Sequence, residues 1–288
     1  MHKKYRDFMK KYQNYLRSCN RHGIEIDFFN NDDSNQIKKE NLPSIDIVSE
    51  TKIENEIQQE ITSCNNDFQL ESAINYAFEK IVDENSNDQI TIESLSLLHD
   101  VVYSLRRNTN VFCRIDVITS LIDLLYHPNL DIIMATLKLI NVLTQGSRDP
   151  INLLIDNDLL LVLPDLIGEV SNQQEDDSIF HFIFLISANI AALSSKKVNL
   201  LVNLGYSNFL FQNINEKNIN IQLAAAFLAS NIMTKGLNDD IEKSINLSII
   251  DHLFQFLNED YEPHLFHCIL DGITNCLQNN VEIENILI

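Results

Sequence analysis

Residues 217–236, KNINIQLAAAFLASNIMTKG, have the spacing of a helix with two different faces. Apolar side chains recur three and four residues apart on one of them, at Ile221, Ala224, Ala225, Leu228 and Ile232. Phe227 and Asn231 lie four residues apart on a second stripe. An asparagine inside an apolar helix has poor helix propensity and an amide that needs partners. Asn231 therefore either bonds to backbone within the fold or points toward a molecule outside the chain.

The same arrangement occurs in three other segments. Asn141 in LKLINVLTQGS, Asn189 in FLISANIAALS and Asn275 in DGITNCLQNN also lie late in apolar stretches that end in polar residues. From Asn141 to Asn275, by way of Asn189 and Asn231, the asparagines are 48, 42 and 44 residues apart. Such a period indicates an internal helical repeat.

The composition favours an all-helical protein. The 288 residues are 45% hydrophobic, enough to bury a substantial core, and include only 6 Gly and 5 Pro, few for a many-stranded sheet protein with tight turns. The five cysteines are odd in number and have no CxxC spacing, which is typical of a reducing compartment. With no apolar run of membrane-spanning length and no secretory signal, we expect a cytoplasmic and nuclear protein without a membrane partner.

The charge is unevenly distributed. The net charge is -20, yet residues 1–22 carry seven basic residues against one acidic residue, or +6, and the rest carries -26. An acidic body of this kind makes nucleic acid a poor partner, because phosphate repels it, and favours basic partners or docking of the arm. Acidity that serves only solubility is the alternative. The basic residues of the arm are Lys3, Lys4, Arg6, Lys10, Lys11, Arg17 and Arg21.

Three regions follow from the pattern: a basic arm at 1–22, an acidic and polar linker at 23–51, and a helical solenoid at 52–288. After Arg107 the helices recur as short, medium and long, in units of about 42 residues, which indicates armadillo repeats that bury their faces only against neighbours. We delimit units at about 52–84, an abbreviated 85–108, and then 109–146, 147–194, 195–236 and 237–288. Two-helix HEAT units are the alternative where the first helix is weak. The predicted fold is all-α, a right-handed superhelical armadillo-type solenoid of about five to six repeats with a flexible basic arm and a concave groove lined by third helices.

Four segments of the chain are similar to those of one known protein family. The segments VVYSLRRNTNVFCRIDVITSLIDLLYHPNLDIIMATLKLINVLTQGS and HLFHCILDGITNCLQNN resemble the central repeats and the penultimate repeat, respectively, of the importin alpha (karyopherin alpha) family of nuclear import adaptors. ITSCNNDFQLESAINYAFEKI resembles the first repeat, and KKYRDFMKKYQNYLRSCNRHGIEID resembles the importin-β-binding arm.

The resemblance implies a binding site. In the family, an Asn on each third helix bonds the backbone of an extended basic cargo peptide, and a Trp one turn earlier holds a Lys or Arg stem. It therefore implies a groove of Asn141, Asn189, Phe227, Asn231, Asp271 and Asn275, and importin β as a possible second partner. This chain departs from the family because it has no Trp and fewer repeats. The residues four before each Asn are Leu137, Leu185, Phe227 and Asp271, so only Phe227 keeps an aromatic ring.

Two alternatives stay open for these residues. Each Asn is either a peptide ligand or a cross-link between neighbouring helices, as buried polar side chains often are. His264, His267, Cys268 and Asp271 have a spacing that a metal can use on one helix, but ordinary packing is the better interpretation without a second ligand cluster. We expect no metal, no cofactor and no enzymatic activity, since no phosphate loop or nucleophile elbow is present.

The sequence therefore favours an adaptor that binds a basic, nuclear-localisation-type peptide in the groove of the solenoid. The alternative is an interaction scaffold of the same fold that has lost signal recognition and binds a folded protein.

Overall fold

The computed structural model describes residues 67–83, 86–104, 109–171, 177–213, 218–245, 247–257 and 263–278. Within these ranges the chain forms thirteen α-helices and one short 3-10 helix, with no strand. The predicted arm (1–22), the linker (23–51) and residues 52–66 lie outside the described residues. All described residues belong to one compact unit.

The helices group into five successive units, and a unit has up to three helices. The first described unit consists of α3 (Asp67–Val82) and α4 (Asp88–Ser104). The second consists of the 3-10 helix η1 (Asn110–Phe112), α5 (Ile115–Leu124) and α6 (Leu130–Thr144). The third is α7 (Arg148–Asp156), α8 (Leu159–Ser171) and α9 (Asp177–Ala191). The fourth is α10 (Ser195–Asn203), α11 (Tyr206–Asn213) and α12 (Ile219–Lys235), and the fifth is α13 (Asn238–Ser244), α14 (Leu247–Gln255) and α15 (Pro263–Gln278).

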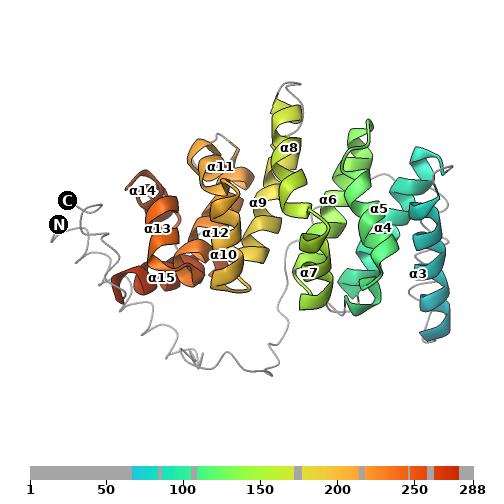
Figure 1. Cartoon of the computed structure of the whole chain (residues 1–288), viewed down its shortest axis with the longest axis horizontal. Helices are drawn as coiled ribbons and strands as arrows, with labels where there is room; N and C mark the ends of the chain where they lie inside the picture. Colours follow the sequence, from blue (N-terminus) through green and yellow to red (C-terminus); the bar gives the residue numbers. More distant parts are fainter. Residues whose placement is uncertain are drawn as a thin grey trace. The chain divides into compact units, whose positions relative to one another are not determined.

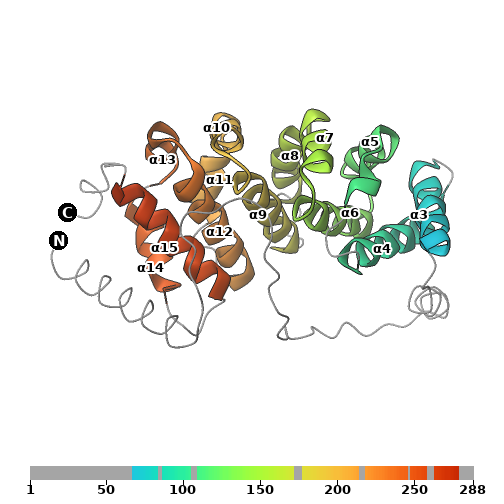
Figure 2. The ribbon, with the colours of Figure 1, turned by 90° about the horizontal axis from the view of Figure 1, so that it is seen from below.

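The units stack in chain order, as the side view of Figure 1 shows. Each third helix packs against the next, so that α4, α6, α9, α12 and α15 form one continuous row. Figure 2 shows this row and, along the opposite edge, the first helices α7, α10 and α13. The predicted all-helical solenoid with a row of third helices is therefore confirmed.

The predicted boundary between units 52–84 and 85–108 was wrong. Helices α3 and α4 pack against each other, α3 also packs against α5, and α4 packs against α6. Helices α3 and α4 are therefore the second and third helices of a single unit. The boundary was misplaced because α4 has the length of a third helix, 17 residues, but no asparagine at the expected place.

Three of the third helices begin with the same capping interaction. The side-chain oxygens of Asn87, Asn129 and Asn218 accept hydrogen bonds from backbone N–H groups in the first turn of α4, α6 and α12, each at 2.9 Å. An asparagine cap stabilises a helix by about 0.5–2 kcal/mol relative to alanine, because it satisfies a donor that the helix itself leaves free.

The turn from first to second helix uses a left-handed residue in two units. Asp158 between α7 and α8 has φ of 68°, and Gly205 between α10 and α11 has φ of 84°. A residue in this conformation ends one helix and turns the chain sharply into the next. The second helix then packs against the first, α8 on α7 and α11 on α10.

Small residues let α12 approach both of its neighbours. Four alanines of α12 are buried: Ala224, Ala225, Ala226 and Ala229. On the facing helix α15, a Cβ atom added to Gly272 would lie 2.9 Å from Met233 Cβ and 3.0 Å from the Ser230 carbonyl oxygen. Only glycine therefore fits at this crossing, where the backbones of α12 and α15 come close.

Candidate functional site

The third-helix row carries the residues predicted to line a groove. Four residues before each asparagine, Leu137 is fully buried, Leu185 and Phe227 are half-buried, and Asp271 is exposed. Leu137 is therefore a core residue, whereas the other three reach the surface of α9, α12 and α15. Asn141 is 8% exposed, and Asn189, Asn231 and Asn275 are half-buried.

Asn189 bonds to two side chains of the preceding third helix. Its Nδ2 donates to Asn141 Oδ1 at 3.2 Å and to Thr144 Oγ1 at 3.0 Å. Thr144 is buried, and its hydroxyl donates to the backbone carbonyl of Asn141 at 2.8 Å. Asn141, Thr144 and Asn189 therefore form one network that joins α6 to α9.

Asn231 and Asn275 bond instead to backbone carbonyls of the preceding third helix. Asn231 Nδ2 donates to the carbonyl of Ala188 at 3.0 Å, and Asn275 Nδ2 donates to the carbonyl of Met233 at 2.8 Å. Ala188 comes one residue before Asn189, whereas Met233 comes two residues after Asn231. The acceptor thus shifts by three residues between the two steps of the row. At both steps the amide links neighbouring units, as the cross-link interpretation expects.

Few charges lie on the central third helices. Each of these helices has a single Asp, Glu, Lys or Arg residue: Asp177 in α9, Lys235 in α12 and Asp271 in α15. Surrounding protein atoms raise the pKa of Asp271, and the charges of His267 and Lys235 partly oppose this rise. The net charge of -20 is therefore concentrated away from α9 and α12, and Asp271 is the one acidic residue of α15.

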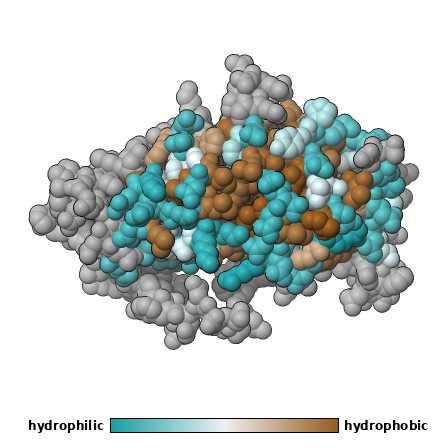
Figure 3. Space-filling model, in the orientation of Figure 1, coloured by the Kyte–Doolittle hydropathy of each residue, from teal (hydrophilic) through white to brown (hydrophobic). Residues whose placement is uncertain are grey.

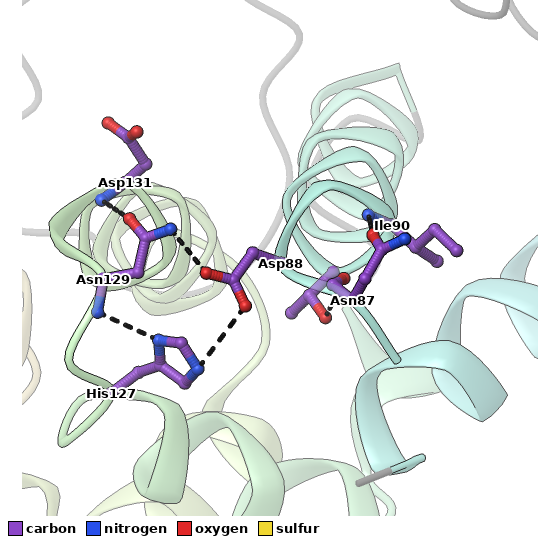
Figure 4. A network of polar contacts seen from close by, with 7 residues as sticks. Asn87, Asp88, Ile90, His127, Asn129 and Asp131 are labelled. Carbon is purple, nitrogen blue, oxygen red and sulfur yellow. Dashed lines mark hydrogen bonds and ion pairs between the residues drawn. The ribbon is translucent and has the colours of Figure 1, made fainter. Parts of the chain in front are cut away.

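Further polar contacts hold the units together near the start of the third helices. In Figure 4, Asn129 Nδ2 donates to Asp88 Oδ2 at 2.7 Å, and His127 Nε2 lies 4.0 Å from Asp88 Oδ1. The Asn129 N–H donates to His127 Nδ1 at 3.1 Å, so Nδ1 is the unprotonated ring nitrogen and Nε2–H faces the carboxylate. Similarly, His181 Nδ1 of α9 bonds the Asn220 carbonyl of α12 at 3.0 Å.

The face opposite the third-helix row has exposed apolar residues but none of the predicted site residues. Figure 3, in the orientation of Figure 1, views the side on which α7, α10 and α13 lie, and apolar residues gather near its middle between polar ones. Leu161 of the second helix α8 is 51% exposed. The predicted site residues belong instead to third helices, which Figure 2 shows on the other side.

The described residues contain no group of three or more His, Cys, Asp or Glu side chains placed to hold a metal ion. Of the four α15 residues whose spacing a metal could use, His264 has a side chain that lies outside the described residues. Likewise, no described helix is long and apolar enough to cross a bilayer.

No protein-family model and no curated protein matches the chain. Solved structures do match. A designed armadillo-repeat protein is 19% identical, with a TM-score of 0.51 over 82% of this chain and 87% of the other. Computationally designed armadillo-repeat proteins for modular peptide recognition are 13% identical, with a TM-score of 0.51 over 78% of this chain and 99% of theirs. The chain has an armadillo-repeat fold.

A further armadillo match is a designed repeat protein in complex with the peptide (KR)4. It is 12% identical, with a TM-score of 0.56 over 77% of this chain and 92% of the other. Identities this low establish the armadillo fold alone. Because these three structures are designed proteins, they leave the resemblance to importin alpha as a prediction from the sequence.

Sequence reasoning missed Thr144, although a signal for it was present. Thr144 and Thr234 lie three residues after Asn141 and Asn231, respectively, and each lies two residues before a glycine. In the structure Thr234 Oγ1 donates to the Ser230 carbonyl at 2.8 Å and lacks the asparagine contact that Thr144 makes. The pattern therefore marks both threonines, but only the packing of α6 on α9 distinguishes them.

Proposed function

We propose that this armadillo solenoid is a non-enzymatic scaffold that binds an extended peptide of a partner protein across α9, α12 and α15. The supporting observation is Phe227, half-buried one turn before Asn231 on the central helix of the three. A flat aromatic ring next to an amide suits an extended peptide, because the amide bonds its backbone and the ring contacts one side chain. The designed relative in complex with (KR)4 supports peptide binding by this fold.

The narrower form of the proposal is a nuclear import adaptor with a basic cargo peptide. Phe227 would lie under one Lys or Arg side chain, and the Asp271 carboxylate would attract another. Asn189, Asn231 and Asn275 would hold the peptide backbone. In this form the protein moves between cytoplasm and nucleus, and the arm at 1–22 binds importin β. Loss of importin β binding on removal of residues 1–22 is the expected result, and unchanged binding would exclude the arm.

The test of peptide binding is a fluorescence titration of the full chain with labelled (KR)4 at low and at physiological ionic strength. We expect Phe227→Ala to weaken binding about twofold to 30-fold, because a cation over an aromatic ring contributes about 0.5–2 kcal/mol. Tyr126→Ala, which removes a 54% exposed ring after the second helix α5, is the matched control and should leave the affinity unchanged. No binding by the unmodified chain even at low salt would refute the proposal.

A second candidate function is a scaffold for a folded partner. Two observations favour it: the chain has no Trp, and the amide nitrogens of Asn231 and Asn275 already bond to neighbouring backbone. A stoichiometric folded partner that binds Asn231→Ala as tightly as the unmodified chain would support this function over peptide binding.

A further inference from the structure

The network of Asn141, Thr144 and Asn189 determines which atoms of each amide stay available. The Thr144 hydroxyl hydrogen is already used, because it donates to the Asn141 carbonyl at 2.8 Å. Thr144 Oγ1 can therefore only accept from Asn189, so it must face the NH2 group of that amide and not its oxygen. The orientation of Asn189 is thus fixed by the chemistry of its partner.

Asn189 is left with an acceptor only. Its two amide hydrogens go to Thr144 Oγ1 and Asn141 Oδ1, at 3.0 Å and 3.2 Å, and Oδ1 of Asn189 is the atom that remains. Since an amide oxygen cannot donate, Asn189 can bond a peptide N–H but cannot bond a peptide carbonyl.

Asn141 is left with the opposite group. Its Oδ1 accepts from Asn189, so its Nδ2 is the group that remains for a ligand. Among the described residues, Nδ2 of Asn141 makes no hydrogen bond, and Asn141 is not fully buried, at 8% exposed. The α6–α9 step therefore presents a donor on one helix and an acceptor on the next.

Asn231 differs from this pair. One amide hydrogen goes to the Ala188 carbonyl, which leaves the second hydrogen and Oδ1. Asn231 can therefore donate and accept by itself, whereas Asn141 and Asn189 can do so only together.

We propose that Asn141 and Asn189 bind one residue of the extended peptide as a pair, Asn141 donating to its carbonyl and Asn189 accepting from its N–H, with Thr144 as the positioning residue. An extended residue presents its N–H and C=O along the same edge, as in a hydrogen-bonded pair of antiparallel strands. This pair therefore replaces the two separate asparagine sites that the sequence predicted at these positions. The inference rests on the proposed peptide-binding function.

Thr144 acts through Asn189 and needs no contact with the peptide. Without the hydroxyl, one amide hydrogen of Asn189 loses its acceptor, and the fixed division into donor and acceptor is lost. Thr144→Val should then weaken binding of labelled (KR)4 by about tenfold, the equivalent of one hydrogen bond, while Thr144→Ser restores it to within about twofold.

The matched control is Thr136 on the same helix. It is fully buried, and its hydroxyl donates to the Ile132 carbonyl at 2.7 Å without an asparagine contact. Thr136→Val removes the same kind of hydroxyl, so any loss of stability common to both variants appears in urea unfolding of both. Only Thr144→Val should change the peptide affinity.

A double-mutant cycle tests the pairing itself. If the two amides bind one residue together, Asn141→Ala and Asn189→Ala should each weaken (KR)4 binding by about tenfold, and the double variant by little more than either. If the losses of the two single variants multiply in the double variant, or if Thr144→Val and Thr136→Val bind the peptide equally well, the pairing is overturned. The proposed function then stands if Asn231→Ala still weakens binding. No peptide binding by the unmodified chain would overturn both.

Discussion

Among single residues, His252 of α14 shows how burial without a partner affects stability. The residue is 3% exposed, its Nε2 has no hydrogen-bond partner in the described part of the chain, and burial lowers its pKa. Phe256 contacts the ring edge to face, with centroids 5.1 Å apart. Between the lowered pKa of the folded chain and about 6.5, the ordinary pKa of histidine, the unfolded chain binds a proton that the folded chain does not. Stability therefore falls as the pH drops through this range.

Replacement of His252 with leucine should remove part of this pH dependence. We expect the free energy of unfolding of the unmodified chain to decrease between pH 7 and pH 5, and to decrease less in His252→Leu, as measured by urea unfolding at both values. Burial also lowers the pKa of His181, so a smaller slope should remain. At pH 7 the variant should be as stable or more so, because an unsatisfied buried polar group costs about 1–3 kcal/mol. Equal slopes would contradict the assignment to His252.

The four asparagines of the third helices could be found from the sequence, but their partners could not. Position and period of Asn141, Asn189, Asn231 and Asn275 follow from hydrophobic spacing. The acceptors of Asn189, Asn231 and Asn275 lie 42 to 48 residues away, and two of these acceptors are backbone carbonyls that no residue type marks. Which carbonyl is reached depends on the axial offset of two helices, which the hydrophobic spacing within one helix does not determine.

At the level of elements, the crossing of α12 and α15 depends on Gly272. Alanine favours a helix over glycine by about 1 kcal/mol, so a helix considered alone would gain from Gly272→Ala. At this crossing the new Cβ would lie 2.9 Å from Met233 Cβ and 3.0 Å from a backbone oxygen, and the two helices must move apart. We expect a net loss of about 1–3 kcal/mol in urea unfolding.

The control for this variant is Asp271→Ala on the same helix. Asp271 is exposed, so the change should alter the free energy of unfolding by no more than about 0.5 kcal/mol. A more stable Gly272→Ala would show that helix propensity outweighs the close approach.

Element order was predictable where turn chemistry and helix length agreed. The three-helix order was correct for α7 to α15 because Gly205 and polar breaks separate the first and second helices. The predicted helix order was wrong before residue 109. There, α4 has His99 and Asp100 near the position where the other third helices have an asparagine, so the residue that marks the repeat is absent. The correct grouping there comes from packing of α3 on α5 and α4 on α6.

Across the whole solenoid, each unit contacts its neighbours, so stability is nearly a sum of units and interfaces. Tyr206 joins the third and fourth units, because its fully buried hydroxyl donates to the Leu160 carbonyl of α8 at 3.1 Å. Tyr206→Phe leaves that carbonyl without its donor at a cost of about 1–2 kcal/mol. We therefore expect that, in Tyr206→Phe, the first three units separate from the last two in urea before either group of units unfolds.

This separation can be followed by hydrogen exchange of α6 and α12 amides at intermediate urea. In the variant, the two sets of amides should lose protection at different urea concentrations. Tyr103→Phe, with a 71% exposed ring on α4, should behave like the unmodified chain. A single shared transition in Tyr206→Phe would show that the solenoid unfolds as one cooperative body.

The three-residue shift between the Asn231 and Asn275 acceptors limits how interchangeable the units are. Three residues correspond to about 4.5 Å along a helix axis, nearly one turn. Consider a chimaera whose final unit is a second copy of residues 195–236. Its last asparagine would bond to the carbonyl one residue before the preceding asparagine, as Asn231 does, and not to the carbonyl two residues after it, as Asn275 does. Modular engineering by copying one unit would therefore change the spacing of the amides along the row, and this chain is better modified in place than rebuilt from identical modules.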